Sequence, residues 1–126
     1  MHVGDATAPV IATSTVNLDL QGCLHDETLV APGYNGRAFS AFNFLTRKWY
    51  RTYVDNDGVR VHLSGELVGG RMEFAGSKVD AHGQAGDIRV VWEPASADVV
   101  RQSWTFSTDG GATWSEPYVL VMTRRP

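Results

Sequence analysis

The chain contains the segment Ser107-Thr108-Asp109-Gly110-Gly111-Ala112-Thr113-Trp114, which fills every position of the Ser-x-Asp-x-Gly-x-Thr-Trp pattern known as an Asp-box. The Asp109 carboxylate can accept hydrogen bonds from amides of its own turn, and Gly110 and Gly111 permit the positive φ that a tight reversal requires. We expect Trp114 to cover the root of the resulting β-hairpin. Because these side chains are used locally, the motif predicts a hairpin staple rather than a ligand-binding or catalytic site.

Working outward from this hairpin, alternation of apolar and polar residues dominates the chain, and no window of helical length carries an apolar stripe at helical spacing. Turn signals such as Pro32–Gly36, Asp55–Gly58 and Gly69-Gly70 separate the alternating segments. The expected strands span residues 10–20, 24–31, 37–45, 49–55, 59–68, 71–75, 87–93, 99–107 and 114–124. We expect residues 77–86 to form a polar, extended hairpin connection.

A chain of 126 residues has the length of one domain that can bury a core without disulfides or a metal. We expect a short flexible arm over residues 1–9 and a single domain over residues 10–126. Short strands joined by tight turns predict an all-β antiparallel meander, which at this length forms a sandwich or closes into a barrel of about 8 to 9 strands; we favour the barrel. A β-propeller needs several blades and several Asp-boxes, and this chain carries one Asp-box.

Composition and charge exclude several classes of function. The net charge is -3, and the basic residues are scattered except at Arg124-Arg125, so we expect no nucleic-acid partner. The N-terminus lacks a basic segment followed by an apolar one, and no apolar run approaches the ~18 residues of a membrane span. We therefore expect a cytoplasmic protein without a membrane partner.

The single cysteine, Cys23, excludes an internal disulfide and an all-cysteine metal cage, and it favours a buried thiol in a reducing compartment. The sequence contains no HxH or HExxH pattern, no glycine-rich phosphate loop and no Gly-x-Ser-x-Gly elbow. We expect no metal and no cofactor.

The densest group of reactive side chains is Cys23-Leu24-His25-Asp26-Glu27. Alternation places Cys23, His25 and Glu27 on one face, where His25 and Glu27 would form an acid/base pair inside a cavity. The structural alternative is a thiol packed in the wall, with His25 and Glu27 satisfying polar groups near a strand end.

Other strands mix large aromatic and polar residues. Trp49, Arg51, Tyr53 and Asp55 share a face that suits either a polar-lined cavity or a solvated outer surface. Asn43 interrupts an apolar row, so it either faces a cavity or hydrogen-bonds a strand end. We expect the barrel interior to contain Val59, Val61, Leu63, Leu67, Ile88, Val90, Trp92, Trp104 and Phe106, with Gln102 in the same row as Trp104 and His62 on the outer surface.

Several segments in this order resemble a family of small bacterial lipocalin-like proteins. The matching segments are Gly22–Glu27, Ser40–Phe44, Lys48–Asn56, Ile88–Glu93 and Val100–Trp104, followed by the Asp-box. The resemblance covers about residues 15–124 and implies a calycin-type antiparallel barrel with a central cavity. It implies no known reaction.

The chain departs from this family at two places. Members usually begin with a further strand of Phe-Trp and Gly-x-Trp type that plugs one barrel end, and nothing before Val10 matches it. The open edge would be closed by residues 8–20, covered by a second copy in a homodimer, or left as a wider cavity mouth. Arg51 stands where a neutral polar residue is expected, and if it points inward it would bind an anionic or enolate oxygen.

These features predict a protein that binds or converts a hydrophobic small molecule. The first hypothesis is a cofactor-independent isomerase or cyclase that restricts the shape of an apolar or polyketide-like substrate. Its catalytic candidates are His25 and Glu27 as acid and base, with Arg51, Tyr53 and Asn43 orienting or polarising a carbonyl.

The alternative is a non-catalytic carrier or sensor of a hydrophobic ligand. The candidate ligand-binding residues are Asn43, Trp49, Trp92, Gln102 and Trp104. A third hypothesis is a structural module whose exposed sheet edge pairs with a partner.

Overall fold

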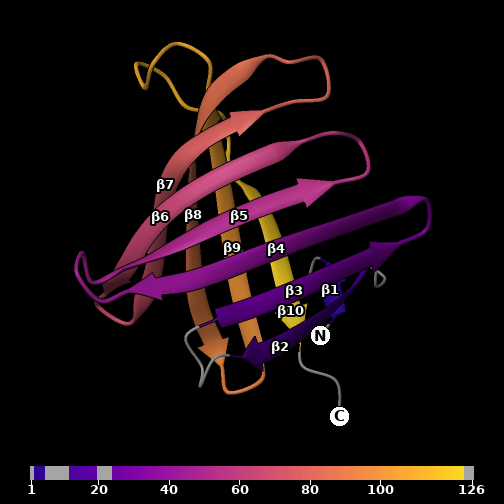
Figure 1. The fold of residues 1–126 in the computed structure, drawn as a ribbon, viewed down its shortest axis with the longest axis vertical. Helices are drawn as coiled ribbons and strands as arrows, with labels where there is room; N and C mark the ends of the chain where they lie inside the picture. The colour runs from indigo at the N-terminus through magenta and orange to yellow at the C-terminus, as the bar shows by residue number, and fades with distance from the viewer. Residues whose placement is uncertain (1, 5–11, 20–23, 124–126) are drawn as a thin grey trace.

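The computed structural model describes residues 2–4, 12–19 and 24–123, and all regular structure in these ranges is β (Figure 1). The strands are β1 (His2–Gly4), β2 (Ala12–Asp19), β3 (Leu24–Ala31), β4 (Tyr34–Asn43), β5 (Lys48–Asp55), β6 (Arg60–Val68), β7 (Arg71–Val79), β8 (Ala85–Ser96), β9 (Val99–Ser107) and β10 (Tyr118–Thr123). The described ranges contain no helix long and apolar enough to cross a membrane.

Strands β2 to β10 form an antiparallel meander in which each strand pairs with its neighbours in sequence. The sheet is strongly curled into a half-barrel (Figure 1). The short strand β1 pairs with both ends of this meander, through His2↔Thr123 on β10 and His2↔Thr13 on β2. The expected all-β antiparallel meander is therefore confirmed. Cys23 and most of the expected N-terminal arm lie outside the described residues.

Several expected boundaries are wrong: β4 already begins at Tyr34 and ends at Asn43, and β8 extends to Ser96. Strand β7 continues to Val79 and β8 begins at Ala85, so the turn between them is Asp80–Gln84 and not the longer loop 77–86. The Asp80 carboxylate tightens this turn by accepting hydrogen bonds from the amides of His82 and Gln84, both at 2.9 Å. The strand pairing therefore persists through the polar residues that looked like a loop.

The last strand begins at Tyr118 and not at Trp114. The Ser115 amide donates to the Phe106 carbonyl at 2.8 Å, and its hydroxyl accepts from the Phe106 amide at 3.0 Å. Pro117 follows, and proline has no amide hydrogen to contribute to a ladder. The ladder between β9 and β10 starts only after it.

The Asp-box performs the local role expected of it. The Ser107 hydroxyl donates to Asp109 Oδ1 at 2.7 Å and accepts from the Gly111 amide at 2.9 Å. Asp109 also accepts from both the amide and the hydroxyl of Thr113. Trp114 packs on the outer face of the sheet, with the Arg89 guanidinium 4.2 Å from its ring centre. The motif thus staples the connection after β9.

The core lies inside the curve of the sheet. Its buried cluster consists of Val61, Leu63, Phe74, Ile88 and Val90. Leu67, which we expected inside, is instead 68% exposed because it lies near the Gly69-Gly70 turn, where the hairpin extends past this cluster. His62 is exposed, as expected.

Two glycines, one on β6 and one on β7, allow these two strands to approach each other closely. A Cβ atom at Gly76 would lie 1.8 Å from the His62 carbonyl oxygen, and one at Gly65 would lie 2.1 Å from the Glu73 carbonyl oxygen. Neither position accepts a side chain without backbone movement. Glycines at such positions are a known means of curving a sheet.

Candidate ligand cavity

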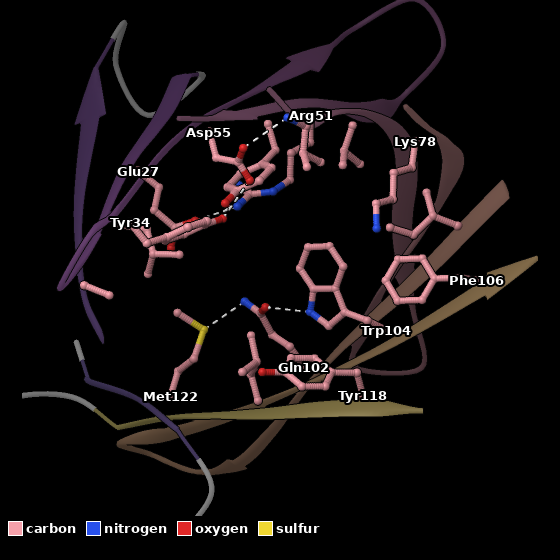
Figure 2. Close-up of a pocket in the computed structure, with 17 residues that line it drawn as sticks. Glu27, Tyr34, Arg51, Asp55, Lys78, Gln102, Trp104, Phe106, Tyr118 and Met122 are labelled. Carbon is pink, nitrogen blue, oxygen red and sulfur yellow. Dashed lines mark hydrogen bonds and ion pairs between the residues drawn. The ribbon is translucent and has the colours of Figure 1, made fainter. Parts of the chain in front are cut away.

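The concave side of the sheet encloses a cavity of about 440 Å³ (Figure 2). Every strand from β3 to β10, both included, contributes to its lining, together with Val59 in the connection between β5 and β6. Most of the lining is apolar or aromatic: Leu29, Ala31, Tyr34, Tyr53, Val59, Val61, Ile88, Trp104, Phe106, Tyr118, Leu120 and Met122. Five polar or charged residues complete it: Glu27, Arg51, Asp55, Lys78 and Gln102.

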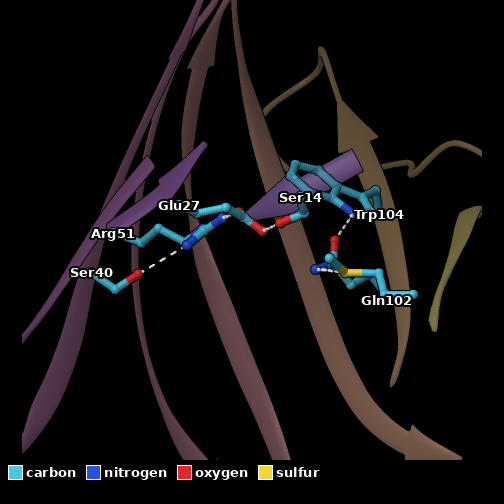
Figure 3. Close-up of polar contacts among 7 residues, drawn as sticks. Ser14, Glu27, Ser40, Arg51, Gln102 and Trp104 are labelled. Atoms are coloured by element: carbon cyan, nitrogen blue, oxygen red, sulfur yellow. Dashed lines mark hydrogen bonds and ion pairs between the residues drawn. The ribbon is translucent and has the colours of Figure 1, made fainter. Parts of the chain in front are cut away.

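Arg51 and Glu27 form a buried ion pair in the wall of the cavity. Arg51 Nη2 lies 2.5 Å from Glu27 Oε1, and the two side chains are only 4% and 10% exposed. Arg51 Nη1 donates to the Ser40 hydroxyl at 3.0 Å, and the Ser14 hydroxyl donates to Glu27 Oε2 at 2.5 Å (Figure 3). Both carboxylate oxygens are therefore engaged, while the guanidinium is fixed and keeps further N–H groups for other partners.

The neighbouring strand supplies the space for this pair. Gly36, Ala38 and Ser40 on β4 stand opposite Asp55, Tyr53 and Arg51 on β5. A Cβ atom at Gly36 would lie 2.6 Å from the Tyr53 hydroxyl oxygen. The small residues of β4 thus make room for the large polar residues of β5.

A second fixed polar group comes from β9. Gln102 is buried, and its amide nitrogen donates to Met122 Sδ at 2.8 Å. Trp104 Nε1 donates to Gln102 Oε1 at 3.1 Å, as Figures 2 and 3 show. Because an amide nitrogen carries two hydrogens, Gln102 retains one donor for a ligand.

Tyr34 and Asp55 lie at the end of the cavity next to the turns. The Tyr34 hydroxyl donates to Asp55 Oδ2 at 3.0 Å, while Asp55 Oδ1 accepts from the amides of Asp57 and Val59. Burial and the Asp55 carboxylate raise the pKa of Tyr34 far above its usual range. Tyr34 therefore stays protonated and hydrogen-bonded at physiological pH.

Five of the candidate residues line the cavity together. They are Glu27, Arg51, Tyr53, Gln102 and Trp104. The face that carries Trp49, Arg51, Tyr53 and Asp55 is thus the inner face of β5, which decides between the two alternatives left open by the sequence.

The other four candidates lie away from the cavity. Trp92 contacts Arg51, whose guanidinium carbon is 4.9 Å from the Trp92 ring centre, but it does not line the cavity. The His25 ring lies 6.5 Å from that of Trp92. Trp49 packs edge-on against Phe42 at 5.4 Å. Asn43 is exposed, and its side-chain oxygen accepts from the amides of Leu45 and Thr46, so it bonds a strand end.

His25 is separated from the cavity although it shares a strand with Glu27. Its Nδ1 atom and the Trp92 Nε1 atom are buried and have no hydrogen-bond partner in the described part of the chain. Burial, followed by the Arg51 charge, lowers the pKa of His25, while Glu27 and Asp26 oppose this shift. His25 does not line the cavity, and both carboxylate oxygens of Glu27 are engaged by Arg51 and Ser14, so the geometry gives no support to an acid/base pair inside the cavity.

Sequence reasoning did not identify several lining residues, namely Leu29, Ala31, Tyr34, Lys78, Tyr118, Leu120 and Met122. Tyr34 and Lys78 were assigned to loops, although each continues the inward row of its strand: Tyr34 precedes Gly36 and Ala38, and Lys78 follows Phe74 and Gly76. Extending the two-residue period past the polar neighbours would have found both.

Comparison with protein-family models and with curated proteins gives no match to this chain. In the ranges 2–4, 12–19 and 24–123, no three His, Cys, Asp or Glu side chains are grouped so that they could hold a metal ion.

Proposed function

We propose that this chain binds a small, mostly apolar molecule that carries an oxygen acceptor, in a lipocalin-like barrel. One observation carries the proposal: an apolar cavity of about 440 Å³ has the fixed donors of Arg51 and Gln102 in its wall. Ligand sites are typically cavities of ~300–1,000 Å³ with mainly apolar walls and a few placed polar groups. The apolar wall would supply affinity, and the donors would orient the ligand.

Closure of the sheet into a barrel belongs to this proposal. The pairing of β1 with both β10 and β2 supports it, because these contacts join the two ends of the meander. A closed sheet has no free edge at this seam, and it would hold the cavity walls at a fixed separation.

A cofactor-independent isomerase or cyclase is the second candidate. Arg51 favours it, because an immobilised guanidinium beside an apolar cavity can stabilise a developing enolate oxygen. Tyr53 lines the same cavity. The suggested pairing of His25 with Glu27 gains no support from the geometry, so binding without reaction is the first choice.

Filling the cavity tests the binding proposal. The neutral fluorescent probe N-phenyl-1-naphthylamine is titrated into the wild-type protein, Leu120→Trp and the control Val119→Trp. Leu120 lines the cavity, whereas its neighbour Val119 does not. We expect Leu120→Trp to raise the probe Kd by about ten-fold or more and Val119→Trp to change it by less than about two-fold.

Absence of probe binding to the wild-type protein, or equal weakening by the two variants, would exclude the cavity as the binding site. A reaction is tested separately by incubating the protein with enone and polyketone ligands and analysing what is recovered. The second candidate requires an isomer of unchanged mass, formed more slowly by Tyr53→Phe at unchanged ligand affinity.

A further inference from the structure

We infer that the cavity selects apolar carboxylic acids and that Lys78 binds their carboxylate. The inference rests on the proposed binding function and names the class of ligand. It starts from the position of Lys78 on β7, where this residue pairs with Val61 on β6 and Gly86 on β8. Its ammonium group points toward the aromatic side of the cavity, with Nζ 4.4 Å from the Phe106 ring centre (Figure 2).

The other charged groups of the cavity already have partners. Glu27 and Arg51 neutralise each other across 2.5 Å. The Asp55 carboxylate accepts hydrogen bonds from the Tyr34 hydroxyl and from two backbone amides. Each of these groups is thus compensated without a ligand.

Lys78 differs from them. In the part of the chain that the structure describes, no carboxylate lies within ion-pair distance of its ammonium group. Hydrogen bonds from the amides of Gln84 and His82 hold Asp80 in the β7–β8 turn and lower its pKa, and the Lys78 charge makes the smallest contribution to this shift. Among the described residues, the ammonium group lies over the Phe106 ring and forms no ion pair, so its donor hydrogens can serve an anion.

This arrangement defines the ligand by its chemistry. A carboxylate at Lys78 would gain a charge-assisted hydrogen bond beside an apolar wall, where water screens the interaction less than at an open surface. The apolar part of the ligand would extend along Val61, Ile88 and Leu120. A neutral analogue of the same shape would gain the apolar contacts but not the ion pair.

The test compares decanoate with 1-decanol as competitors of bound N-phenyl-1-naphthylamine at pH 7.5. The chain has two lysines, so Lys48→Met on the exposed start of β5 is a matched control for Lys78→Met. We expect Lys78→Met to raise the Kd of decanoate by about ten-fold, as for loss of one charged hydrogen bond. The Kd of decanol should change by less than about two-fold. Lys48→Met should change neither the decanoate affinity nor the decanol affinity. Lys78→Arg should retain decanoate binding.

The outcomes separate this inference from the function on which it rests. If the probe binds but decanoate competes no better than decanol, or if Lys78→Met weakens both equally, the selection for acids is wrong while the binding function stands. If the probe does not bind to the wild-type protein, both fail. Probe binding by Lys78→Met shows that the cavity remains intact in the variant.

Discussion

Two neighbouring residues of β3 form ion pairs, of which one is buried and the other is partly exposed to solvent. Glu27 pairs with Arg51 inside the sheet, where the side chains are 10% and 4% exposed, whereas Asp26 pairs with Arg37 outside, where they are 28% and 50% exposed. Removing one partner of a buried pair leaves an uncompensated charge in a poorly solvated site, but water replaces the missing partner at the surface. The two arginines therefore contribute very differently to stability.

We predict that Arg51→Met lowers the free energy of unfolding by about 3–5 kcal/mol, because it leaves the Glu27 carboxylate buried and unpaired. The control Arg37→Met should cost less than about 1 kcal/mol. Urea unfolding followed by tryptophan fluorescence measures both values. The double variant Glu27→Leu/Arg51→Met should recover most of the loss, and equal costs for the two single arginine variants would contradict the prediction.

At the scale of elements, the Asp-box connects β9 to β10 through a carboxylate that must stay ionised. Hydrogen bonds from the Thr113 hydroxyl and amide and from the Ser107 hydroxyl lower the pKa of Asp109 to about 2, from an ordinary value of 3.8. A carboxyl group with a lowered pKa stabilises the folded state fully above its unfolded pKa. That contribution decreases as the pH falls from about 4 and is lost below about 2.

We predict that Asp109→Asn lowers the Tm at pH 5 to 7 and that the Tm difference from the wild-type protein shrinks between pH 4 and pH 2, the window set by these two pKa values. Thermal unfolding followed by circular dichroism from pH 2 to 7 measures this difference. Thr108→Ala is the control, because Thr108 is exposed and lies in the same turn. A difference that stays constant with pH would show that the charge of Asp109 does not stabilise the turn.

The elements of this fold were more predictable than their inner faces. Strands β3 and β9 have the expected bounds, because each is an alternating segment limited by turn residues. On β4, apolar residues occupy both faces: Phe42 is half-buried, and Phe39 is 42% exposed beneath the Arg37 guanidinium. Hydrophobicity alone could not assign the inner face of this strand.

The cavity itself depends on contacts between strands. It exists because small residues on β4 stand opposite large ones on β5, a relation that only the register fixes. The sequence placed Gln102 and Trp104 on an inward row but left the face of Arg51 and Tyr53 undecided between a cavity and the outer surface. His25 and Glu27 share a face by alternation, yet only Glu27 lines the cavity.

At the scale of the whole molecule, the buried Arg51–Glu27 pair lies between two different interiors. On one side is the cavity, whose rim includes Tyr118, 57% exposed. On the other side, aromatic side chains pack together, with Phe42 5.4 Å from Trp49 and Phe74 5.3 Å from Trp92. A ligand would therefore enter at the end that carries Tyr34 and Tyr118, because packed rings obstruct the opposite end.

Strand β1 pairs with both ends of the curled sheet, so its removal would leave two strand edges open to a second copy. Strand β1 covers backbone groups of both β2 and β10 through only three residues, His2–Gly4. Without it, two strands would present unpaired amides and carbonyls, which are templates for pairing with a second copy. The homodimer considered from the sequence would then use the same edges.

We predict that deleting residues 1–4 causes concentration-dependent self-association, whereas the full chain stays monomeric. Analytical ultracentrifugation over a hundred-fold range of concentration, ~1 to 100 μM, measures the difference, because unpaired edges associate by mass action. A control in which Gly-Ser-Gly replaces residues 2–4 keeps the chain length but favours strand formation less, so it should show intermediate association. If all three proteins sediment as monomers, β1 does not protect these edges; if the full chain already dimerises, the seam is covered by a second copy.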